Sequence, residues 1–360
     1  MSSSLRTEFF ETVLHRLLSC MRKRQPDNFD FNRFSFDGVD RSNDFNAAYH
    51  EQNLSLFIAN HERFEQTWNS LKDQQSRDLF LELILWRLAG HLHVRLSTNN
   101  ALYWHLHKDA LTVPSVPSRL DFTGVFGPLR HYDEIRAGGR RLKIDCWPGS
   151  IAHAFFLKQY FFQRDGVAIA PDMNEQVIDG GALFGDTALA FAAAVGELGR
   201  VYSFDPLESH AKIVTHNISQ NGFQDHVRFF PVGLAAVGND VVGPVSTEQI
   251  VNPGFTLEGT SEVDRFPLRT LDGLVAGGAV ERVDFLKLDI EGSELGALEG
   301  AKETLREFRP KLAISVYHKF SDFFEIPAFI DSLGLHYDLY LDHYTIHSEE
   351  TILYGIPARE

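Results

Sequence analysis

Residues 177–192, "VIDGGALFGDTALAFA", combine a short apolar run that ends in Asp179, a glycine-rich turn and an alanine-rich segment from Asp186. This order predicts a buried strand, a tight turn over Gly180, Gly181 and Gly185, and a helix. In open α/β sheets, ligands bind just outside the carboxyl ends of the strands, where glycines let the backbone approach a ligand. A tight turn without a ligand explains the glycines alone equally well.

The same rhythm continues along the chain and predicts the fold. Further strand-like runs begin at 199, 227, 283 and 310, and helical segments near Glu208, Ser293 and Ser321 lie between them. This alternation predicts an α/β fold with a mostly parallel sheet and right-handed crossovers. Two last runs, 337–344 and 350–357, have no helix between them, which predicts an antiparallel final pair.

The region before this sheet has a different character. Apolar residues recur at three-to-four spacing over 5–24 and 51–96, the pattern of amphipathic helices. We therefore expect a helical N-terminal domain over 1–110, a turn- and strand-rich connecting layer over 111–165, and a ligand-binding domain over 166–360. Residues 235–280, rich in Gly, Ser, Thr and Pro, interrupt that last domain and are typical of a binding loop or lid.

Composition excludes several classes of protein. The chain has 360 residues, 44% of them hydrophobic, which is typical of a globular protein. Its formal charge of −15 argues against nucleic acid or an anionic membrane surface as a partner. Cys20 and Cys146 are far apart and suit a reducing cytoplasm, where we expect the protein. Glu82 and Arg87 interrupt the longest apolar stretch, so we expect no membrane span.

A carboxylate, Asp205, ends the second predicted strand and is followed by Pro206. An acid at this place accepts the paired hydroxyls of an adenosine ribose. The first turn reads G-G-x-x-x-G after an acid, unlike the G-x-G-x-x-G turn that binds a dinucleotide pyrophosphate, and its acid suits a cationic ligand better. Asp205 also suits a cap of the following helix. Together these features favour a ligand that contains a nucleoside.

The fourth predicted strand, in "FLKLDIEGSELGALEGA" (285–301), delivers Lys287, Asp289 and Glu291 to the same edge. Asp289 and Glu291 alternate with Ile290, so on an extended backbone they point to one side. Two such carboxylates hold a divalent cation, act as a general base or bind an ammonium group. A cap at Ser293 and favourable charges at the start of the helix explain Glu291 as well, but not Asp289.

The fifth predicted strand ends in "SVYHKFSD", which places Tyr317 and His318 at that edge. His318 is the histidine best placed for general acid or base chemistry, because its charge changes near neutral pH. A structural histidine that is bonded to a neighbouring carboxylate is an equal alternative.

Residues 150–357 resemble the FkbM family of S-adenosylmethionine-dependent methyltransferases. The resemblance lies in "VIDGGALFGDTALAFA", "VYSFDPLESHAKIVTHNISQN", "SVYHKFSDFFEIPAFI" and, most specifically, "LKLDIEGSELGALEGA". It implies the seven-stranded sheet of class I methyltransferases, S-adenosylmethionine as cofactor, and O-methylation of a sugar or polyketide-type hydroxyl. The acceptor is then a small molecule or glycan with a free hydroxyl group.

The resemblance also implies roles for individual residues. The turn from Asp179 to Gly185, with Asp186 and Thr187, would hold the methionine part of the cofactor, and Asp205 with Pro206 the ribose. Asp289 and Glu291 would border the acceptor site, where they are also candidate ligands of a divalent metal such as magnesium. Independently of the resemblance, the predicted place of Asp289 and His318 at strand ends makes either one a candidate to take the hydroxyl proton, and Lys287 is a further catalytic candidate.

Two positions depart from the family pattern, and two other functions stay open. Asp205 stands where the family usually has Glu, and Ser315 where an acid is frequent. The second departure puts in doubt a metal or base role for that strand position. A nicotinamide-dependent oxidoreductase and a non-catalytic protein that retains the cofactor fold are the alternatives.

Overall fold

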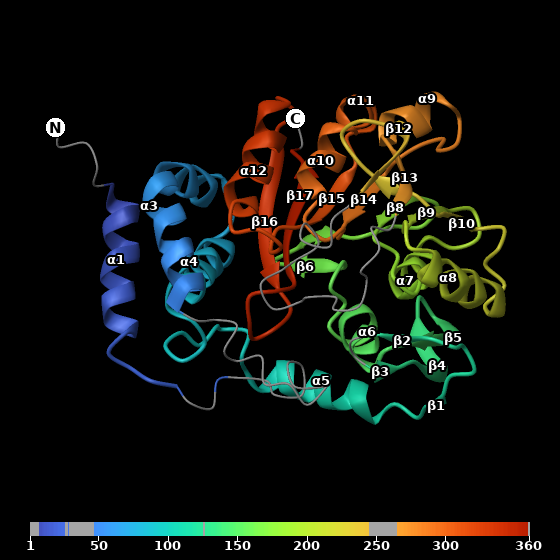
Figure 1. Ribbon diagram of the computed structural model, residues 1–360, viewed down its shortest axis with the longest axis horizontal. Helices are drawn as coiled ribbons and strands as arrows, with labels where there is room; N and C mark the ends of the chain where they lie inside the picture. The colour runs from blue at the N-terminus through green and yellow to red at the C-terminus, as the bar shows by residue number, and fades with distance from the viewer. Residues whose placement is uncertain (1–6, 26–27, 29–46, 125–126, 245–264, 359–360) are drawn as a thin grey trace.

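The computed structural model describes residues 7–25, 28, 47–124, 127–244 and 265–358. Its centre is a seven-stranded sheet in the order β10-β9-β8-β14-β15-β17-β16 (Figure 1). β17 runs antiparallel to β15 and β16, and the other pairings are parallel. The strands are β8 (Gln176–Gly180), β9 (Arg200–Phe204), β10 (Val227–Phe230), β14 (Phe285–Leu288), β15 (Lys311–Ser315), β16 (Tyr337–His343) and β17 (Thr351–Pro357). The predicted fold class is confirmed, including the antiparallel last pair.

Helices cover both faces of this sheet because successive strand residues point to opposite sides. Ile178 and Leu286 pack into one core, whereas the preceding Val177 and Phe285 pack into the other. The second core contains α7 (Asp186–Val195) and α8 (Glu208–Gln220). The first contains α9 (Leu271–Ala276), α10 (Glu294–Glu299), α11 (Lys302–Phe308) and α12 (Asp322–Ser332).

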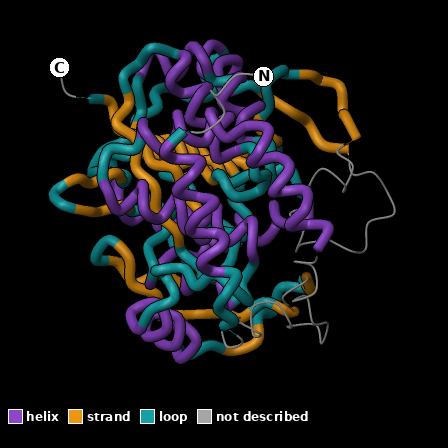
Figure 2. The backbone as a smooth tube through the Cα atoms, turned by 90° about the vertical axis from the view of Figure 1, so that its left-hand side faces the viewer, coloured by secondary structure: helices purple, strands orange, loops and turns teal. Residues whose placement is uncertain are grey.

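The N-terminal helices are α1 (Glu8–Cys20), α3 (Ala47–Ser70), α4 (Gln74–Ala89) and α5 (Ala101–Thr112). Of these helices, α3 packs against α12 and α4 against β16, α1 lies on the outer side of α3 and α4, and α5 lies beside α6 (Pro148–Ile151) (Figures 1 and 2). Residues of α1, α3 and α4 belong to the same core as α10–α12, so this region and the sheet share one apolar interior. The expected three-domain division stays a prediction.

The prediction of helical structure throughout 51–96 was wrong at two places. α3 ends at Ser70, and α4 begins after Asp73, whose carboxylate accepts a hydrogen bond from the Ser76 amide (2.6 Å) as an N-cap. α4 then ends at Ala89, because Gly90 takes φ +76° and leaves the helical path. Residues 91–96 therefore form turns.

The connecting layer contains a long hairpin, β4 (Arg130–Ala137) and β5 (Arg140–Cys146). A short pair, β6 (Phe162–Arg164) and β7 (Val167–Ile169), leads into β8, after the short helix α6 (Pro148–Ile151) and a π-helical turn (Ala152–Phe156). Small strand pairs at β1 (Val116–Pro117), β2 (Thr123–Gly124) and β3 (Gly127–Pro128) complete it.

β11 (Gly233–Leu234) directly precedes the predicted insertion, and β12 (Asn239–Pro244) and β13 (Arg265–Arg269) lie within it. Residues 245–264, the centre of the predicted lid, lie outside the described residues. Among the described helices, none is both long and apolar enough to cross a membrane.

Candidate active site

The glycine turn after β8 is shaped by a close approach of two strand ends. Gly181 has φ +86°, and a Cβ atom there would lie 1.8 Å from the carbonyl oxygen of Asp289. The Asp289 amide in turn donates to Gly180 O (3.0 Å). Only glycine fits this position, because any side chain would push the end of β14 away from β8. Gly185 takes φ +82° and precedes α7.

Asp179 and Lys287 form a buried ion pair beneath the turn. Asp179 is 0% exposed, and its carboxylate accepts hydrogen bonds from Thr187 Oγ1 (2.8 Å) and Ser203 Oγ (2.7 Å). Lys287 Nζ lies 3.2 Å from Asp179 Oδ1 and donates to Gly180 O and Gly181 O (2.9 and 2.7 Å). The cation that meets Asp179 is therefore the chain's own lysine.

This arrangement shows what occupies the groups at the strand ends. Lys287 is 1% exposed and its ammonium is engaged by Asp179 and two carbonyl oxygens. A catalytic role of Lys287 stays a prediction. We expected the polar groups of Asp179 and Thr187 to face a ligand, but Thr187 Oγ1 donates to Asp179 instead. Both side chains therefore stabilise the glycine turn. Asp186, in the first turn of α7, is buried, and burial raises its pKa to about 6.

Asp205 lies at the carboxyl end of β9, and its carboxylate already has partners. It accepts from the amides of Leu183 and Leu207 (3.0 Å each), and His210 Nδ1 lies 3.1 Å from both oxygens. The N-cap residue of α8 is Leu207, and α8 has no side-chain cap, so the alternative that Asp205 caps this helix was wrong. Pro206, between these groups, is half-buried.

The acids after β14 do not lie on an extended backbone. The strand ends at Leu288, and Glu291 takes the left-handed φ of +56°, so the predicted alternation of Asp289 and Glu291 was wrong. The turn nevertheless brings both carboxylates to the same imidazole. His318 Nε2 lies 3.5 Å from Asp289 Oδ1 and 3.4 Å from Glu291 Oε2.

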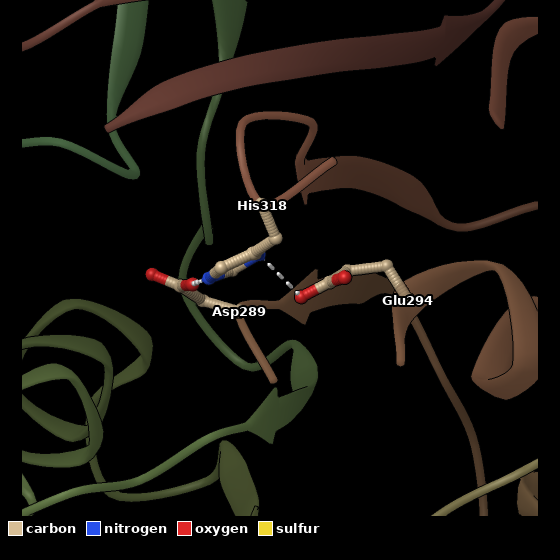
Figure 3. A group of neighbouring side chains, drawn as sticks. All are labelled: Asp289, Glu294 and His318. Atoms are coloured by element: carbon tan, nitrogen blue, oxygen red, sulfur yellow. Dashed lines mark ion pairs between the residues drawn. The ribbon is translucent and has the colours of Figure 1, made fainter. Parts of the chain in front are cut away.

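A third carboxylate, Glu294, faces the other nitrogen of this ring (Figure 3). Glu294 Oε1 lies 3.1 Å from His318 Nδ1 and accepts a hydrogen bond from the Ile290 amide (2.7 Å). Ser293, the N-cap residue of α10, makes no side-chain cap bond, so the cap that we predicted there was wrong. Glu294 is the first residue of α10, and sequence reasoning did not place it against His318.

Two phenols complete the surroundings of Asp289. Tyr160 donates to Asp289 Oδ2 (2.6 Å), and Tyr317 donates to Oδ1 (3.0 Å). Gln159 Nε2 bonds both the Tyr160 hydroxyl (3.2 Å) and Glu350 Oε2 (2.6 Å). These residues lie far apart in the sequence, and sequence reasoning did not place Tyr160 or Glu350 at this site.

The electrostatics of the cluster favour a charged pair. Burial disfavours the imidazolium form of His318, but Glu294 and Glu291 outweigh it and raise its pKa well above the usual range. Burial likewise opposes ionisation of Asp289, yet His318 and Lys287 lower the pKa of that carboxyl. At neutral pH the site therefore holds a carboxylate beside an imidazolium.

This donor set does not fit a magnesium ion. We expected Asp289 and Glu291 as ligands, whereas the described group with donor atoms within 4.8 Å of one another is Asp289, Glu294 and His318. Magnesium prefers six oxygen ligands, and an imidazolium repels a cation. The site is therefore not proposed to bind a divalent metal.

Comparison with known proteins finds a matching domain and a similar fold. Residues 179–339 match the methyltransferase FkbM domain. The solved structure of methyltransferase FkbM from Methylobacillus flagellatus KT is similar, with 19% identity over 84% of this chain and 60% of that chain, and a TM-score of 0.53. This chain thus spans about 60% of the length of that protein.

More distant matches include Aeropyrum pernix fibrillarin with bound S-adenosyl-L-methionine (12% identity, 68% of this chain, 100% of that chain, TM-score 0.38). An S-adenosylmethionine-dependent O-methyltransferase from Thermotoga maritima matches at 15% identity over 69% of this chain and 87% of that chain (TM-score 0.33). None of the curated proteins compared with the chain matches it. The sheet is that of the class I methyltransferases. Residues 179–339 form an FkbM methyltransferase domain, as the sequence resemblance predicted.

Proposed function

We propose that this protein is an S-adenosylmethionine-dependent O-methyltransferase that acts on a hydroxyl group of a sugar or another secondary metabolite. The observation that carries the proposal is the place of Asp289. Its carboxylate is ionised, 17% exposed, and lies directly beside the glycine turn at the carboxyl end of the sheet. In open α/β sheets this edge receives the ligand.

The residues have distinct parts in the proposed reaction. When bound, S-adenosylmethionine supplies an electrophilic methyl group. Asp289 orients the acceptor hydroxyl and takes its proton as the new oxygen–carbon bond forms and the sulfur–carbon bond breaks. His318, charged and only 3% exposed in its side chain, acts as the counter-ion of Asp289 instead of as the base. Glu291, 55% exposed, borders the acceptor from the solvent side.

The cofactor would lie across the ends of β8 and β9. Gly180, Gly181 and Gly185 shape the turn for its methionine part, with Asp186 at the start of α7, and Asp205 faces the ribose beside Pro206. Ribose binding requires His210 to give up part of its contact with Asp205. A cytoplasmic location remains part of this proposal, and both cysteines are free.

The turn does not suit a dinucleotide. The amides of Gly181 and Ala182 already donate to Phe204 O (2.8 and 3.0 Å), and the Leu183 amide donates to Asp205. A pyrophosphate needs such N–H groups free, together with a helix terminus without an acid. This disfavours the oxidoreductase alternative.

The test is a calorimetric titration with S-adenosylhomocysteine and, in parallel, NADH. We expect S-adenosylhomocysteine to bind, and Asp205→Asn to weaken it at least tenfold, since the amide accepts fewer ribose hydrogen bonds. Asp225→Asn, at an exposed position before β10, is the matched control and should bind normally. Binding of NADH alone would refute the proposal. Cofactor binding without methyl transfer to any hydroxyl compound would favour the non-catalytic alternative.

A further inference from the structure

Arg87, on α4, is a buried charge outside the FkbM domain. It is 2% exposed, and its guanidinium donates to Tyr317 O, to Ser348 O (3.2 Å) and to the Tyr49 hydroxyl (3.4 Å). Within the described part of the chain, Arg87 forms no ion pair. A buried cation without a carboxylate partner is costly, so the carbonyl oxygens are what hold it in place.

The two carbonyl acceptors belong to the two turns that build the active site. Tyr317 carries the phenol that donates to Asp289, and its ring lies 4.1 Å from the ring of His318. Ser348 lies two residues before Glu350, whose carboxylate accepts a hydrogen bond from Gln159. A guanidinium is a planar group with donors in a fixed geometry, so a single side chain sets the spacing of both turns.

Arg87 is itself anchored by the helix behind it. Its carbonyl oxygen accepts a hydrogen bond from Asn53 Nδ2 (3.2 Å) and lies 3.0 Å from His50 Nδ1, both on α3. Its guanidinium carbon lies 5.9 Å from the ring centres of Phe320 and Phe323. The side chain therefore extends from a fixed backbone through an aromatic layer to the site.

We propose that Arg87 is a positioning residue, which fixes the turn of Tyr317 and His318 so that phenol and imidazole stay against Asp289. The inference rests on the proposed function, because it gives Arg87 a part in that reaction without contact with substrate. It also gives the N-terminal helical region a role, because Arg87 on α4 fixes the positions of two turns of the site.

The test observes the imidazole of His318 directly. Histidine ring signals are recorded by NMR in the full chain, and His318→Gln assigns the signal of His318. We expect Arg87→Met to move this signal from its wild-type position. Arg87→Lys should move it less, because lysine retains the positive charge but lacks the planar set of donors of the guanidinium. The affinity for S-adenosylhomocysteine should stay within twofold of wild type.

Arg164→Met is the matched control. Arg164 is also a buried arginine that joins α4 to the sheet, through ion pairs with Asp73 and Asp342 (3.2 Å each), but it contacts neither site turn. It should leave the His318 signal in place. An unmoved signal in Arg87→Met, or an equal shift in Arg164→Met, would overturn the inference.

Two further points keep the result decisive. If Arg87→Met does not fold, the same comparison is made between Arg87→Lys and Arg164→Lys. The NMR experiment needs neither cofactor nor acceptor, so a failure of the proposed function appears separately, as absent binding of S-adenosylhomocysteine to the wild-type protein.

Discussion

Asp289→Asn tests the chemistry most directly, because it removes the charge and nearly preserves the shape. The carboxylate accepts two phenol hydrogen bonds and faces an imidazolium, whereas the amide retains one acceptor oxygen and cannot take a proton. A positioned general base contributes about 10²–10⁴-fold in rate, so we expect turnover to fall at least about 10²-fold. Hydrogen bonds to charged groups contribute about 1.5–3 kcal/mol, so the free energy of unfolding should fall by about 2 kcal/mol.

The assay follows transfer of a labelled methyl group from S-adenosylmethionine to an acceptor that the wild-type protein methylates. Binding of S-adenosylhomocysteine is measured on the same samples and should change by less than threefold. Glu291→Gln is the control for loss of a nearby charge, because that side chain is exposed, and it should lower turnover less than tenfold. A variant Asp289→Asn that turns over within threefold of wild type would refute the role of Asp289 as base.

Three further predictions concern the stability of the site. The raised pKa of His318 means that its imidazolium stabilises the fold fully below its usual pKa, and that this contribution is lost as pH rises through the higher folded value. The difference in free energy of urea unfolding between wild type and His318→Gln should therefore shrink at alkaline pH, and a constant difference would contradict it. Gly181→Ala should destabilise the protein more than Gly185→Ala, because the first Cβ would clash with backbone at 1.8 Å from Asp289 O, whereas the second would lie 3.6 Å from Val214 Cα. Both positions share a positive φ that costs about 1–3 kcal/mol. Lys287→Met leaves its partner carboxylate buried and unpaired, which costs about 3–5 kcal/mol; an unchanged midpoint of urea unfolding would show that the pair is not needed.

The sheet was predictable from sequence because its signals are local. Each strand is a short apolar run, each crossover is a helical segment, and the glycine turn and Asp205 mark strand ends within a few residues. The sequence also identified Asp289 and Glu291 as candidates, since a charged residue at the end of an apolar strand has few structural explanations. The geometry of these two acids could not be predicted, because no glycine marks the left-handed turn at Glu291.

The rest of the site depends on contacts between distant segments. Tyr160 and Asp289 are joined by one hydrogen bond, yet more than a hundred residues separate them. Periodicity indicates which face of an element is buried and not what lies against it, so it could not connect Tyr160 with Asp289. In the sequence, Arg87 was likewise only a charged residue that interrupts an apolar stretch. In the structure it is buried and bonds specific groups of distant segments.

The site divides between the shared domain and the rest of the chain. Asp289, Glu294 and His318 come from the matched residues 179–339, but Tyr160 and Arg87 precede that range. A carboxylate stays ionised in a mostly buried place only where opposite charge and donors surround it, and here part of that environment comes from outside the domain. His318 and Lys287, which lower the pKa of Asp289, come from the matched residues, and Tyr160 adds a hydrogen bond from outside them. If Asp289 is the base, as we propose, its proton affinity therefore depends mainly on the domain and in part on the segment before it.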